Sequence, residues 1–101
     1  MNEFQVSCIT KSLPNGGHEH ITHIGGPAGG GWQLTRESAI ARIRGKSERF
    51  FTLDKTSGGK VYIAVVEEAG KAPYLRTYAD GKWNDNLLAQ PTCPISIRVI
   101  S

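Results

Sequence analysis

The sequence predicts an α+β fold, a single curled antiparallel or mixed sheet of five to six strands with one helix, at about residues 35–45, on one face. Three observations favour this class. Several segments alternate in polarity with the period of a strand, only one has the period and end signals of a helix, and twelve glycines with five prolines supply many turns. The 101 residues have room for one domain, and we expect residues 1–101 to form it. A partly open barrel is the main variant.

Strands are expected where apolar residues alternate with polar ones between turn residues. Residues 4–10 alternate in this way, and residues 18–24 return after the turn at 14–17, so the two segments predict a hairpin. Residues 60–68 are apolar on both faces, which places that strand in the centre of the sheet. The other expected elements are three strands and one helical turn: 49–53, 74–78, 95–100 and 84–89.

The one helix candidate lies in the segment 32–45. Thr35 can cap its first turn, Glu37 lies where the helix dipole favours an anion, and Gly45 suits the position after the last turn. Before it, residues 25–31 contain five glycines, which predicts a mobile surface loop. Because this loop leads toward a helix N-terminus, an anion or phosphate site is the alternative, although the lysine and serine of a P-loop are missing.

The N-terminal residues lack the features of a signal peptide, and no apolar run is long enough to span a membrane. We therefore expect a cytoplasmic protein of bacterial type that makes no membrane contact. Cys8 and Cys93 form no C-x-x-C pair, so two reduced thiols are expected, and a Cys8–Cys93 bridge is the alternative.

The segment His18-Glu19-His20-Ile21-Thr22-His23 is the candidate metal site. In a strand, His18 and His20 share one face and His23 points away, so a zinc ion would need a third ligand from elsewhere. The simpler interpretation is a strand with exposed histidines. No sequence pattern joins a serine or cysteine to a histidine as in hydrolases, so we expect a protein that is not an enzyme and that has no cofactor.

A basic cluster is the candidate binding site. Between positions 36 and 49, five basic and two acidic residues give a net charge of +3, equal to that of the whole chain. Aromatic residues on nearby strands or turns supply rings on which single-stranded nucleic acid stacks. The simpler interpretation is a solvated helix face with core aromatics. The candidate residues are Arg36, Arg42, Arg44, Lys46, Arg49, Tyr78 and Trp83, with Tyr62 and Tyr74 as further aromatics.

The segment 74–91, YLRTYADGKWNDNLLAQP, resembles the C-terminal motif Y-L-R-T-x-x-D-G-x-x-x-D-N-L of a family of small bacterial proteins catalogued only as a domain of unknown function. Ile9-Thr10, the segment 20–24 and the Trp-x-Leu-Thr helix entry are also similar, and the residues after Pro94 look like an extension. The resemblance implies a shared scaffold and no activity. Turn and cap chemistry explains Asp80, Asp85 and Asn86, whose oxygens could instead face a cation or partner.

These observations favour a small non-enzymatic binding or regulatory module that contacts nucleic acid or an acidic protein through its basic helix face. One alternative is a metal-dependent or phosphate-handling enzyme that uses the His18/His20 hairpin and the glycine-rich loop. Another is a structural homodimer formed through the edge of the terminal strand. The sequence is compatible with a monomer or a homodimer.

Overall fold

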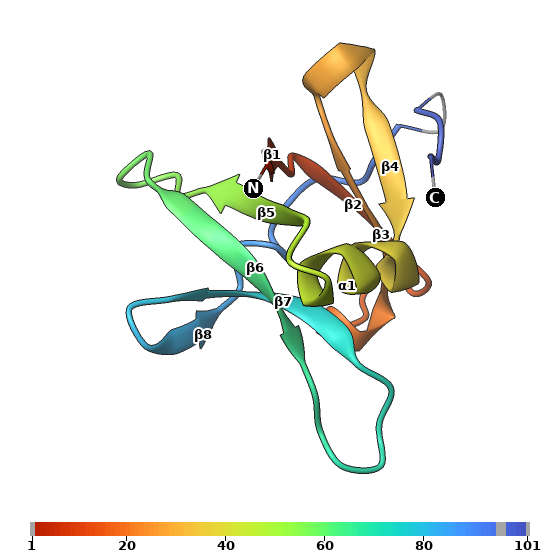
Figure 1. The fold of residues 1–101 in the computed structure, drawn as a ribbon, viewed down its shortest axis with the longest axis vertical. Helices are drawn as coiled ribbons and strands as arrows, with labels where there is room; N and C mark the ends of the chain where they lie inside the picture. The colour runs from red at the N-terminus through yellow and green to blue at the C-terminus, as the bar shows by residue number, and fades with distance from the viewer. Residues whose placement is uncertain (1, 95–96, 101) are drawn as a thin grey trace.

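The structure is a computed structural model that describes residues 2–94 and 97–100 (Figure 1). In chain order the elements are β1 (Asn2–Gln5), β2 (Cys8–Lys11), the 3₁₀ turn η1 (His18–His20), β3 (Ile21–Gly26), the 3₁₀ turn η2 (Ala28–Gly30), β4 (Trp32–Thr35), α1 (Arg36–Arg44), β5 (Glu48–Leu53), β6 (Lys60–Val66), β7 (Tyr74–Ala79) and β8 (Lys82–Asn84).

The strands divide between two sheets. A five-stranded mixed sheet has the order β1-β5-β6-β7-β8, in which β1 runs parallel to β5 and the other pairs are antiparallel. A three-stranded antiparallel sheet has the order β2-β3-β4. The α+β class with a single helix is confirmed, with β6 in the centre of its sheet, and the described strands form no closed barrel.

The helix α1 lies between the two sheets and contacts strands of both (Figure 1). The apolar faces of the sheets meet around it, so the burial of these side chains is the main stabilising term of the fold. The largest fully buried apolar side chains are Phe50, Ile9, Ile21, Ile24, Leu34, Leu75, Leu87 and Val6.

The helix begins where the sequence predicts, because the side chain of Thr35 accepts a hydrogen bond from the backbone N–H of Ser38 at 3.2 Å. Two expectations about its ends are wrong. The segment Trp32–Thr35 is the strand β4 rather than the helix entry, and Gly45 keeps a right-handed helical conformation. The left-handed residue that ends the helix is Lys46, with a φ of 56°.

The N-terminal half departs from the prediction in three places. The expected strand 4–10 is split into β1 and β2, and each half joins a different sheet. The hairpin of β2 and β3 is present, but residues 18–20 form η1 rather than a strand. Gly25 and Gly26 are not part of a loop: they are buried residues of β3, because neighbouring atoms fill the space where side chains would lie.

The end of the chain was expected to form a strand at 95–100. Residues 95 and 96 lie outside the described residues, and 97–100 make only an isolated parallel bridge, between Gln33 of β4 and Val99. The expected turn at 84–89 is present, since the N–H of Ala89 donates to the carbonyl of Asp85 at 2.9 Å.

The cysteines are joined, which corrects the expectation of two reduced thiols. Cys8 of β2 and Cys93 form a disulfide, with their Cα atoms 4.7 Å apart and both side chains buried. Residues 91–93 run beside β2, where the N–H of Ile9 donates to the carbonyl of Pro91 and that of Cys93 donates to the carbonyl of Ile9, both at 2.9 Å. This pairing holds the two sulfur atoms together. Reduced thiols were expected because the cytosol is reducing, and that argument does not consider whether the fold brings the two cysteines together.

Helices in the described part of the chain all fall short of the length and apolar character that crossing a membrane requires.

Candidate functional site

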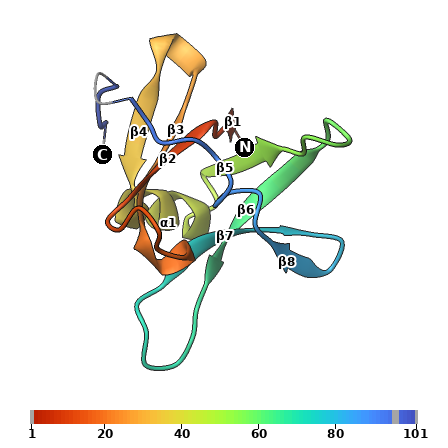
Figure 2. The same ribbon diagram turned by 180° about the vertical axis from the view of Figure 1, so that it is seen from behind.

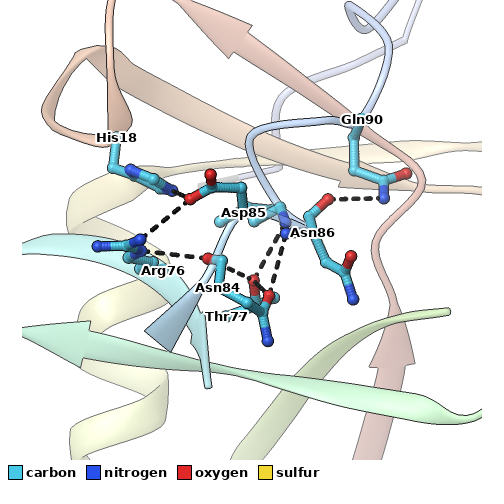
Figure 3. A network of polar contacts seen from close by, with 8 residues as sticks. His18, Arg76, Thr77, Asn84, Asp85, Asn86 and Gln90 are labelled. Atoms are coloured by element: carbon cyan, nitrogen blue, oxygen red, sulfur yellow. Dashed lines mark hydrogen bonds and ion pairs between the residues drawn. The ribbon is translucent and has the colours of Figure 1, made fainter. Parts of the chain in front are cut away.

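Polar residues of the segment 74–91, which contains β7, β8 and the turn after them, form a network of hydrogen bonds (Figure 3). Thr77, fully buried on β7, donates through Oγ1 to Oδ1 of Asn84 at 2.5 Å, and its Oγ1 accepts from the N–H of Leu87 at 3.2 Å. The same Oδ1 of Asn84 accepts from the N–H of Asn86 at 3.0 Å. The network therefore joins β7 to the turn after β8 and satisfies backbone donors that burial would otherwise leave without partners.

Arg76 extends the network toward the surface. Its Nε donates to the carbonyl of Asn84 at 3.1 Å, and a terminal nitrogen donates to Oδ1 of Asp85 at 3.0 Å. These contacts, with the Thr77 contacts, give most polar residues of the motif a structural role. Asp80 and Gly81 make the two-residue turn between β7 and β8, with φ values of 54° and 78°, as predicted.

His18 meets this network, and His20 does not. Nε2 of His18 lies 3.4 Å from Oδ1 of Asp85. Burial lowers the pKa of His18, the nearby Arg76 guanidinium lowers it further, and the carboxylates of Asp85 and Glu19 oppose the shift. His18 is therefore neutral at neutral pH, and its contact with Asp85 is not an ion pair under those conditions.

The Thr77 contacts lead to a prediction about stability. Thr77→Val keeps the shape of the side chain but leaves the Leu87 N–H without its acceptor and removes one of the two donors to Oδ1 of Asn84, so we expect the free energy of unfolding to fall by about 1–3 kcal/mol. Urea denaturation measures the change. Thr52→Val is the matched control, because Thr52 is equally buried and its hydroxyl has no hydrogen-bond partner among the described residues. Equal losses in the two variants would contradict the role of the network.

The predicted basic residues of α1 are mostly paired with carboxylates. Arg36 pairs with Glu37 at 3.2 Å, Arg42 with Glu48 at 2.6 Å, and Arg44 with Glu67. Arg36 also donates to the carbonyl of Glu19 at 2.9 Å, which ties the helix to η1. The helix face therefore presents less available positive charge than the sequence count suggests.

Four aromatic side chains form a row across the five-stranded sheet. The strand registers pair Phe51 with Tyr62, Tyr62 with Tyr78, and Tyr78 with Trp83, so all four point to the same face. Ring centroids lie 6.2 Å apart for Phe51 and Tyr62 and 4.8 Å apart for Tyr78 and Trp83. Phe50, Val61 and Leu75 point to the opposite, buried face. The row thus lies on the face of this sheet opposite the core, although Phe51 at its end is buried, with Nζ of Lys60 over its ring.

Two cations flank this aromatic row. The guanidinium carbon of Arg49 lies 3.8 Å from the ring centroid of Tyr62, and Nζ of Lys60 lies 4.7 Å from that of Phe51. Both are bound by Glu3, at 3.3 Å from Arg49 and 2.9 Å from Lys60. The hydrogen bond from Lys60 is the main cause that lowers the pKa of Glu3. Tyr78 and Trp83 are 42% and 40% exposed, which leaves their rings the most accessible in the row.

One hollow links the helix to this row. A cavity of about 300 Å³ is lined by Lys46, just after α1, together with Arg49 and Tyr62. Of the seven predicted binding residues, the structure thus brings Lys46 beside Arg49 and Tyr78 beside Trp83. Arg36 instead contacts η1, through the carbonyl of Glu19.

The histidine and glycine candidates do not converge on one site. In η1, His18 lies beside Asp85, whereas Nδ1 of His20 lies 3.2 Å from Oγ of Ser12. The described residues contain no group of three or more histidine, cysteine or acidic side chains placed to hold a metal ion. The strand β4 separates the glycine-rich turn from α1, so the turn leads to the helix N-terminus only through Trp32–Thr35 and does not directly precede it.

Sequence reasoning missed Phe51, Lys60 and Glu3 as members of the aromatic face. The alternation of β6 was a usable signal, because Lys60 and Tyr62 have the same parity and so share a face. The register between strands could not be predicted from the sequence, since it depends on turn lengths that the sequence leaves open.

The fold and the network define a small α+β domain of two sheets and one helix, with a structural polar motif near its C-terminal end. The chain belongs to the family described as "Protein of unknown function (DUF3892)", whose model matches residues 5–91. Comparison with curated proteins and with solved structures finds no match. The resemblance noted from the motif is thereby confirmed as membership of a family of unknown function.

Proposed function

We propose that this protein is a non-enzymatic binding module for single-stranded nucleic acid, and that the ligand lies on the aromatic row of the five-stranded sheet. The single observation that carries the proposal is the in-register row of Phe51, Tyr62, Tyr78 and Trp83 on one face. Every base has a π-face, so stacked aromatic side chains bind single strands with little dependence on sequence.

The dimensions of the row suit a short stretch of nucleotides. Neighbouring strands lie about 4.8 Å apart, so a row across four strands extends about 14 Å. Sheets of other folds use such a surface to stack two or three bases. Tyr78 and Trp83, the exposed pair, are the residues on which we expect bases to stack.

Arg49 and Lys60 supply the charge for the phosphates. Both lie against the edge of the row, and both are now neutralised by Glu3. A phosphate that displaces Glu3 would take up the same two cations, and Lys46 stands beside Arg49 across the small cavity. The arginines of α1 have carboxylate partners of their own, so the sheet face rather than the helix face supports the binding proposal best.

The proposal includes a cytoplasmic location, which the sequence predicts, because single-stranded nucleic acid is present there. Cysteines there are generally reduced. The aromatic row belongs to the other sheet from Cys8, so we expect the same affinity with and without a dithiol reductant.

Fluorescence anisotropy with a labelled oligonucleotide of about ten nucleotides, at about 50 mM salt, tests the proposal. We expect the single strand to bind more tightly than its duplex. Trp83→Ala and Tyr78→Ala should each weaken binding about tenfold to hundredfold, because stacking on one aromatic is worth about 1–3 kcal/mol. Leu13→Ala, which removes another exposed apolar side chain far along the chain from the row, is the matched control and should bind as the wild type does.

Charge variants in the same assay separate the two basic surfaces. Arg49→Gln should weaken binding and flatten its salt dependence, whereas Arg44→Gln on the helix should change neither. Glu3→Gln should strengthen binding, because it releases Arg49 and Lys60 from a competing carboxylate. Absence of binding at low salt, or equal binding by Trp83→Ala, would overturn the proposal. Equally tight binding of polyglutamate would point instead to an acidic protein partner.

A further inference from the structure

The outer edge of β4 is occupied by the chain's own C-terminal residues. The N–H of Gln33 donates to the carbonyl of Arg98 at 3.0 Å, and the N–H of Ile100 donates to the carbonyl of Gln33 at 2.8 Å. Gln33 and Val99 therefore form a parallel bridge. Figure 2 shows the C-terminal segment passing across this side of the molecule to lie beside β4. Residues 97–100 thus take the place of an added strand.

The side chain of Gln33 also forms a hydrogen bond with the C-terminal segment. It is 7% exposed, and its Nε2 donates to the carbonyl of Ile97 at 2.9 Å. Its Oε1 accepts from Oγ1 of Thr10 on β2 at 3.2 Å, which fixes the orientation of the amide. All three contacts of Gln33 with the segment are to backbone atoms, so they place no demand on its side chains.

An apolar cavity adjoins this edge. It has a volume of about 360 Å³, and Ile100 forms part of its wall beside the aromatic cluster of Phe4, Trp32 and Phe50. Earlier in the segment, the side chain of Ile97 lies against Gly31, where a Cβ atom would be 3.4 Å from its Cγ1. The edge therefore combines backbone pairing with room for apolar side chains, the two elements by which a sheet recognises an added strand.

The segment that fills the edge lies beyond residues 5–91, the part of the chain that matches the family. We propose that the edge of β4 is a docking site for an extended peptide of another protein, which adds as a parallel strand with an apolar residue beside the aromatic cavity, and that residues 97–100 compete for this site within the chain. This inference is independent of the proposed nucleic-acid function, since it concerns the edge of β4 and the adjoining cavity, which contain none of the four residues of the aromatic row.

A synthetic peptide with the sequence of residues 94–101 tests the proposal on the full-length protein. Ile100→Pro removes the N–H that pairs with Gln33 and so unseats the chain's own segment. We expect this variant to bind the labelled peptide about tenfold or more tightly than the wild type, because an occupied site lowers the apparent affinity by the fraction that is free. Ile100→Asp, which places a carboxylate beside the apolar cavity, is a second variant that should act in the same direction.

Arg98→Ala is the matched control, because only the backbone carbonyl of Arg98 takes part in the pairing, and it should bind the peptide as weakly as the wild type does. A peptide with proline at the position of Ile100 should not bind. Hydrogen exchange at the Gln33 N–H shows whether the segment is unseated. Faster exchange without peptide binding would overturn the proposal, and so would a dimer of the variants in sedimentation, which would assign the edge to a second copy of the chain.

Discussion

Replacing both cysteines, Cys8→Ala with Cys93→Ala, is expected to lower the free energy of unfolding by about 4–5 kcal/mol. The bridge closes a loop across 85 residues of sequence separation, and long loops gain most from a crosslink in the chain-entropy model. A domain of this size has about 5–15 kcal/mol of stability in total. The loss should therefore lower the melting temperature by about 20 °C or more.

Thermal denaturation with and without a dithiol reductant measures this effect. The oxidised wild type should lose most of the difference when reductant is added, whereas the double variant should melt at one temperature in both conditions. Two titratable thiols in unfolded protein prepared without reductant, or a wild-type melting temperature that ignores the reductant, would contradict the bridge.

Gly26→Ala is the second change with a large expected effect. A Cβ atom at this position would lie far inside van der Waals distance of the Gln5 carbonyl oxygen and 2.8 Å from Cζ2 of Trp32. The first contact is with backbone, so it cannot be relieved by a side-chain rotation. We expect a loss of about 3 kcal/mol in the free energy of unfolding, measured by urea denaturation.

Gly17→Ala is the control for this substitution. Its φ of −82° suits alanine, and a Cβ atom there would meet only Glu19 at 3.6 Å, an ordinary contact. Its stability should stay within about 0.5 kcal/mol of the wild type. If Gly26→Ala were as stable as Gly17→Ala, the close approach of β1 and β3 at Gly26 would be wrong.

Much of the fold could be predicted from local patterns. Local residue patterns located β5, β6 and β7, and the cap at Thr35 located the start of α1, because these signals depend on neighbouring residues. The division into two sheets could not be predicted, since the break after Gln5 lets one extended segment join both sheets. The requirement for glycine at position 25 could not be predicted either. A Cβ atom there would lie 2.7 Å from Sγ of Cys8, and this close approach exists only because β2 and β3 pair.

The candidate site was predicted by residue type but not by arrangement. Tyr78, Trp83 and Arg49 were named from their chemistry, and the structure places them on one sheet with Tyr62. The arginines of α1 were counted as free charge, because their partners Glu48 and Glu67 come from other elements and become neighbours only through the fold. His18 and His20 were expected to share the face of a strand, and the 3₁₀ turn separates them.

The central claim is that the sheet face bearing the aromatic row binds single-stranded nucleic acid. Two-dimensional ¹H–¹⁵N NMR of the labelled protein, titrated with a single-stranded oligonucleotide, tests it residue by residue. We predict that the largest shifts occur at Tyr62, Tyr78 and the indole N–H of Trp83, with that of the buried Trp32 unchanged. Shifts confined to α1, or no shifts at low salt, would contradict the account.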